Sequence, residues 1–103
     1  MKRSSIRSRP HRVTDDERAV YLAVELRDQG CMAPRLDPDA GECSGRLTRQ
    51  HVRMQPGGRR TTSIATGVLL CASHHLETGW ATSRHGLALQ REYLRGLYPE
   101  AWS

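Results

Sequence analysis

The chain has 103 residues, which is enough for one domain and too few for two. Hydrophobic residues make up 37%, and no apolar run approaches the roughly 20 residues of a membrane span, so we expect a cytoplasmic protein with a modest core and no membrane partner. The net charge is +5 and nearly every basic residue is arginine, which binds phosphate in planar, bidentate contacts. The composition therefore favours a polyanionic partner.

Charge is distributed unevenly along the chain. Five cations precede the first acidic residue, so we predict a disordered basic arm over residues 1–13, followed by a single domain over 14–103. No apolar run follows the arm, and a secretory signal is not expected. No acidic residue occurs between Glu42 and Glu77. The arginines of that stretch are predicted to contact DNA, and they are Arg46, Arg49, Arg53, Arg59 and Arg60. The alternative is that they form a solvated surface.

The first helix is predicted over residues 15–29. Thr14 and Glu17 form a capping-box pattern, and apolar residues follow at helical spacing. Gly30 is expected to end this helix. Prolines and glycines then recur from residue 31 to 45, which predicts a loop.

The second half of the chain contains shorter elements. Residues 46–53 are interpreted as a short strand, with Leu47, Arg49, His51 and Arg53 on one face and Thr48, Gln50 and Val52 on the other, and glycines at 57 and 58 predict a turn. The apolar run 67–70 is either a second strand or the start of a helix. A last helix is predicted over 84–97. The expected core consists of one face of the first helix with Leu69, Leu70, Leu76, Trp80, Leu87 and Leu94.

Three cysteines are an odd number for a disulfide framework, and a histidine follows the third at helical spacing. Thiolate and imidazole are the usual ligands of structural zinc. We predict that Cys31, Cys43, Cys71 and His74 hold one zinc ion. Three buried and inert cysteines are the alternative.

The other histidines belong to an ordered series of motifs. Gln50-His51-Val52 is followed by Gly57-Gly58, by an apolar run, and by Leu70-Cys71-Ala72-Ser73-His74-His75. A Gly-Trp-Ala-Thr stretch at 79–82 and Tyr93-Leu94 come later. This series resembles the HNH nuclease family, and above all the small HNH proteins of phages and actinobacteria.

The resemblance implies an α+β fold, in which a small ββα-metal, treble-clef-like core is flanked by N- and C-terminal helices. It implies a metal-dependent endonuclease that hydrolyses phosphodiester bonds in DNA by the attack of water. His51 takes the position of the general base. Gln50 and His75 take the positions that bind a catalytic divalent ion, which is Mg²⁺, Mn²⁺, Ni²⁺ or Zn²⁺ in that family. Partners in phage genome packaging or recombination also follow from the resemblance alone.

Two residues depart from the family pattern. Gln50 stands where His or Asp is expected, and Thr66 stands near an expected Asn. His85 is either a third ligand of the catalytic ion or a surface residue. A zinc-stabilised DNA-binding module without cleavage activity is therefore the main alternative function. A protein-interaction adaptor held together by zinc is the third.

Overall fold

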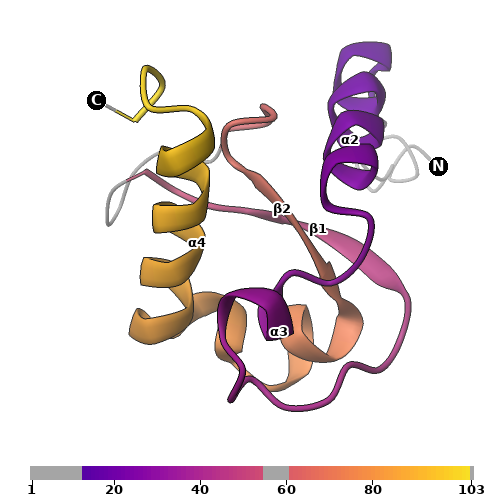
Figure 1. The fold of residues 1–103 in the computed structure, drawn as a ribbon. Coiled ribbons are helices and arrows are strands. Elements are labelled where there is room, and N and C mark those ends of the chain that lie inside the picture. Colours follow the sequence, from indigo (N-terminus) through magenta and orange to yellow (C-terminus); the bar gives the residue numbers. More distant parts are fainter. Residues whose placement is uncertain (1–12, 55–60, 103) are drawn as a thin grey trace, which may run out of the picture.

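The computed structural model describes residues 13–54 and 61–102. Nearly all of the predicted basic arm, together with Arg59, Arg60 and the glycine turn, lies outside the described residues. The fold is α+β, with two longer helices on either side of a two-stranded sheet (Figure 1). In chain order the elements are α2 (Asp15–Asp28), α3 (Ala33–Leu36), β1 (Leu47–His51), β2 (Gly67–Cys71), a π-helical turn (Ser73–Glu77), a 3₁₀ turn (Trp80–Thr82) and α4 (Arg84–Leu97).

Helix α2 begins at the predicted capping box. The backbone N–H of Glu17 donates to Thr14 Oγ1 at 3.1 Å, and the backbone N–H of Thr14 donates to Glu17 Oε1 at 3.0 Å. Its end differs by one residue from the prediction. Gln29, with a φ of 60°, takes the left-handed conformation that was expected at Gly30.

The sheet is an antiparallel pair of β1 and β2, in a register that places Leu47 opposite Cys71 and His51 opposite Gly67. Strand β2 is buried at every residue, because α2 and α4 cover it from two sides. The apolar run 67–70 is therefore a strand, and the helical turn begins only after Cys71.

Helix α2 is fixed to β2 through a buried ion pair. Arg27 Nε and Nη2 donate to the two carboxylate oxygens of Asp28 at 2.7 and 2.9 Å. Arg27 also donates to the carbonyl of Gly67, while the backbone N–H of Leu69 donates to Asp28 at 2.9 Å. The hydroxyl of Tyr93 on α4 donates to the same carboxylate. One ion pair thus joins α2, β2 and α4.

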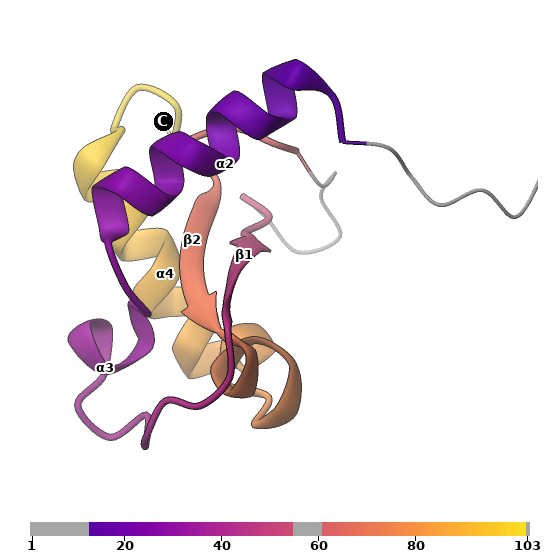
Figure 2. The same cartoon turned by 90° about the vertical axis from the view of Figure 1, so that its right-hand side faces the viewer.

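The segment predicted as a loop over 31–45 contains the short helix α3, which the recurring prolines and glycines did not indicate. Pro34 lies in its first turn, where the missing N–H costs no hydrogen bond. After α3, the Asp37 carboxylate accepts a hydrogen bond from the Trp80 indole at 3.0 Å. Figure 2 shows the loop passing below the hairpin before it enters β1.

Helix α4 has the predicted bounds, and a 3₁₀ turn precedes it. Most predicted core residues are buried, including Leu69, Leu70, Trp80 and Leu94, and Leu87 packs against this core. Leu76 was predicted wrongly, since its side chain is 70% exposed. The short turn that carries it buries Ser73 and His74 instead. No described helix is both long and apolar enough to cross a membrane.

Candidate functional site

The four residues predicted to bind zinc lie together at one end of the hairpin. Their potential ligand atoms, three sulfurs and one ring nitrogen, all lie within 4.8 Å of one another. His74 Nδ1 lies 3.1 Å from Cys71 Sγ and 3.7 Å from the sulfurs of both Cys31 and Cys43. The cluster therefore brings together residues that are as many as 43 positions apart in the chain.

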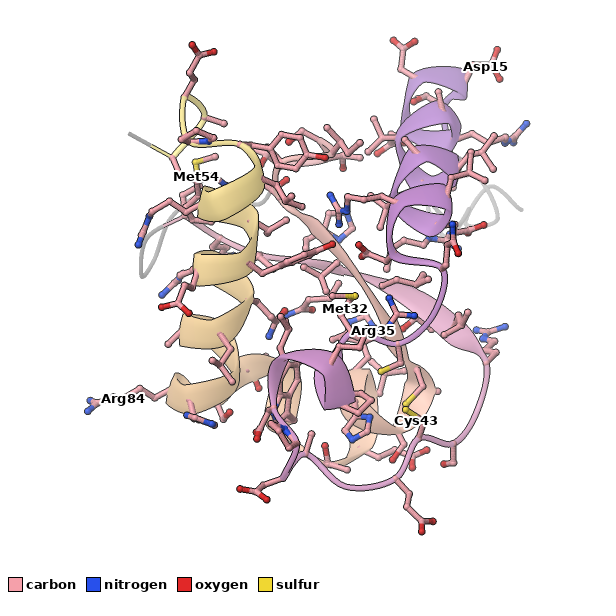
Figure 3. All side chains as sticks on the ribbon, in the orientation of Figure 1. Asp15, Met32, Arg35, Cys43, Met54 and Arg84 are labelled. Atoms are coloured by element: carbon pink, nitrogen blue, oxygen red, sulfur yellow. The ribbon has the colours of Figure 1, made fainter. Side chains whose placement is uncertain are left out.

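Each ligand comes from a different local structure. Cys31 follows α2, Cys43 lies in the loop before β1, Cys71 ends β2, and His74 lies in the helical turn that follows. Figure 3 shows Cys43 on the loop that runs beneath α3 toward β1. A metal bound here would thus connect the end of β2 and the turn after it with the segment between α2 and β1.

The backbone orients the imidazole of His74. Its Nε2 lies 2.9 Å from the carbonyl oxygen of Ala40, so this nitrogen carries the proton and donates. Nδ1 then keeps its lone pair, and it is the nitrogen that faces the three sulfurs. A backbone carbonyl that accepts from the other ring nitrogen is a common support for metal-binding histidines.

The thiols differ in their readiness to ionise. Burial acts to raise the pKa of Cys71, but hydrogen bonds from the backbone N–H groups of His74 and Ser44 act most strongly against it, and its pKa falls to about 6. Desolvation of the Cys43 thiol, followed by its closeness to the sulfurs of Cys31 and Cys71, raises its pKa to about 12. The cluster thus holds a thiolate at neutral pH beside a thiol that has no cation to stabilise its ionised form.

The distances fit a tetrahedral metal. Zinc ligand bonds of about 2.3 Å to sulfur and about 2.0 Å to nitrogen place S and N about 3.5 Å apart in a regular tetrahedron. The three observed S–N separations bracket this value. A Cys₃His donor set is also typical of structural zinc sites. The four residues could therefore hold a structural metal such as zinc.

His51, the predicted general base, lies at the end of β1 in a surface groove. Its Nε2 lies 3.4 Å from Thr62 Oγ1, and its ring meets the ring of Tyr21 edge-on at 6.1 Å between centroids. The groove has a volume of about 480 Å³, within the range of small-molecule sites. It is lined by Tyr21, Arg46, Leu47, Thr48, Arg49 and His51.

The predicted ligands of the catalytic ion lie apart from His51, Gln50 on the other face of β1 and His75 in the turn after β2. Gln50 is buried, and its side-chain nitrogen donates to the carbonyl of Ala81 at 3.1 Å. His75 Nδ1 lies 2.7 Å from Thr48 Oγ1, and that hydroxyl donates to Leu70 O. His75 Nδ1 therefore carries a proton and donates to Thr48. Thr48 and Gln50 share one face of β1, whereas His51 points from the opposite face.

The structure gathers metal ligands at one place within residues 13–54 and 61–102. The Cys₃His cluster is the one group there of three or more Cys, His, Asp or Glu side chains close enough to share an ion. His51 and His75 do not belong to a second such group. His85, the possible third ligand, lies instead 3.4 Å from the Asp37 carboxylate. Thr66 is buried and bonds locally to Ser63 and Thr61.

The predicted DNA-contacting arginines have different surroundings. Arg46 is exposed and has no described carboxylate within ion-pair distance, and Arg53 is also exposed. Arg49 lies 3.2 Å from Glu25 and 4.5 Å over the ring of Tyr21. Sequence reasoning missed Tyr21 and Glu25. Both are on α2, four residues apart, and only the packing of α2 against the hairpin brings them to β1.

Comparison of the chain with models of known protein families, with curated proteins and with solved structures found no match.

Proposed function

We propose that this chain is a zinc-stabilised ββα-metal domain of the HNH type, and that it hydrolyses phosphodiester bonds in DNA. The observation that carries the proposal is the groove on β1, where an imidazole, two guanidinium groups and a tyrosine face the same space. The order of elements supports it, because a β-hairpin leads directly into the turn that carries His74 and His75.

The residues of the groove have separate roles in this proposal. A neutral imidazole can accept a proton near neutral pH, so His51 takes a proton from the attacking water. Arg46 offsets the negative charge of the phosphate. A divalent ion would stabilise the charge on the phosphate oxygens. Gln50 and His75, the residues that the family pattern assigns to this ion, lie outside the groove lining. The Gln50 amide nitrogen donates to the carbonyl of Ala81, so its side chain is held on the buried face of β1.

A DNA-binding module without cleavage activity is the second candidate. It is favoured by the surroundings of Gln50 and His75, which gather no third ligand among the described residues. A neutral amide oxygen also binds a divalent cation more weakly than a carboxylate would. In this case the zinc cluster and the groove arginines would serve binding alone.

A nicking assay separates the two functions. Zinc-loaded protein is incubated with supercoiled plasmid and Mg²⁺, Mn²⁺, Ni²⁺ or Zn²⁺, and the open-circular product is measured. We expect cutting with at least one ion, and we expect His51→Ala to reduce the rate by roughly 100- to 10,000-fold. His85→Ala is the matched control, since this exposed histidine lies outside the groove. If wild type binds DNA but cuts with no ion, the second candidate is correct.

A further inference from the structure

We infer that Tyr21 and Arg49 form a stacking platform for an unpaired base, and that the groove on β1 therefore prefers single-stranded DNA. This inference rests on the proposed function and names the substrate class of that groove. Neither the zinc cluster nor the proposed general base requires it.

The geometry places flat groups against one another. The Arg49 guanidinium carbon lies 4.5 Å from the centroid of the Tyr21 ring, within the distance of a cation–π contact. His51 meets the same ring edge-on, with an angle of 77° between the planes. Tyr21 comes from α2 and the other two from β1, and Figure 2 shows α2 lying across the end of the hairpin. The platform is thus held by the packing of two elements.

The charges assign different tasks to the two arginines of the groove. The Glu25 carboxylate lies 3.2 Å from Arg49 Nη1, so it offsets the charge of Arg49 and would repel a phosphate there. No described carboxylate lies within ion-pair distance of Arg46. Arg46 is therefore the phosphate contact. Arg49 keeps its flat guanidinium, which suits the face of a base better than a phosphate.

A stacking platform distinguishes unpaired from paired bases. In a duplex, neighbouring base pairs cover both faces of every internal base. An unpaired base exposes its face and can stack on an aromatic ring or on a guanidinium plane. Every base has such a face, so we expect little sequence preference at this position.

Binding without a divalent ion tests the inference, because cleavage cannot then interfere. The probes are a labelled oligothymidylate of about 12 nucleotides, inside the usual range of single-strand sites, and a hairpin duplex of the same charge. Fluorescence anisotropy is measured at several salt concentrations for zinc-loaded wild type, Arg49→Lys, Tyr21→Leu and Arg46→Ala. Arg49→Lys keeps the charge and the partner Glu25 but lacks the flat group, so it is the sharpest variant. Zinc content and circular dichroism verify that each variant is folded.

We expect tighter binding of the single strand by wild type. Arg49→Lys and Tyr21→Leu should weaken that binding by roughly five- to a hundredfold, as expected for the loss of one stacked base, with an unchanged salt slope. Arg46→Ala should instead lower the salt slope by about 0.7 and weaken both probes. Equal binding of both probes by wild type, or full single-strand binding by Arg49→Lys, would overturn the inference. Plasmid cutting by wild type would then still support the proposed function, whereas single-strand preference without cutting would refute only that function.

Discussion

Single residues decide the chemistry of the metal cluster. His74 presents Nδ1 to the sulfurs only because Nε2 is bound to the Ala40 carbonyl. The four residues of the cluster could be predicted from the sequence, because three cysteines and a nearby histidine match the chemistry that zinc prefers. The Ala40 contact could not be predicted, since a backbone carbonyl leaves no trace in the residue type. The contact in which Thr48 accepts from His75 could not be predicted either, because it depends on how the turn after β2 packs against β1.

The thiol pKa values predict that metal affinity depends on pH. Cys43, with a pKa of about 12, is protonated in the metal-free cluster and must release its proton when zinc binds. Affinity should therefore fall at least tenfold for each pH unit of acidification near neutrality. Below about pH 6 the Cys71 thiol must also release a proton, and the dependence should become steeper. Competition with a chromogenic chelator between pH 5.5 and 8 measures this; a flat profile would contradict the assignment of these thiols as ligands.

At the scale of elements, local patterns predicted α4 and β1 well and the connecting segments poorly. Helix α4 follows from its apolar spacing, and its Ser83 cap accepts from the backbone N–H of Gly86 at 2.9 Å. Helix α3 and the exposed position of Leu76 depend on which side of a short turn faces the core. A turn of a few residues has too little periodicity to show this in the sequence.

Two glycines of α4 give a matched pair of substitutions. A Cβ on Gly86 would lie 1.9 Å from the carbonyl oxygen of Trp80, so α4 would have to move away from the 3₁₀ turn. A Cβ on Gly96 would contact nothing within 4 Å. We expect Gly86→Ala to lower the free energy of unfolding by about 1–3 kcal/mol or more, which is the usual cost of overpacking. Gly96→Ala should raise it by about 0.5–1 kcal/mol, because alanine favours the helix.

Chemical denaturation of the zinc-loaded protein measures both changes. If Gly86→Ala were as stable as wild type, the close packing of α4 on the 3₁₀ turn would be wrong. A loss of stability in Gly96→Ala would show instead that this face of α4 is covered.

In the molecule as a whole, a small apolar core is supplemented by polar groups that join distant segments of the chain. The buried Arg27–Asp28 pair joins α2, β2 and α4, while the Cys₃His cluster joins the loop after α2 to the hairpin. The α+β class could be predicted from the order of helix and strand patterns. The position of Tyr21 and Glu25 of α2 beside the groove could not be predicted, because contacts between distant segments depend on how complete elements pack.

We propose that one metal site stabilises this fold, formed by Cys31, Cys43, Cys71 and His74. Native mass spectrometry of the protein as purified, and after addition of zinc, tests it most directly. We predict one zinc ion per chain in wild type, none retained by Cys71→Ser, and an unchanged single ion in His85→Ala. Chelation should also lower the melting temperature of wild type. A wild-type chain that takes up no zinc, or that melts at the same temperature with and without it, would show that these four residues do not form a stabilising zinc site.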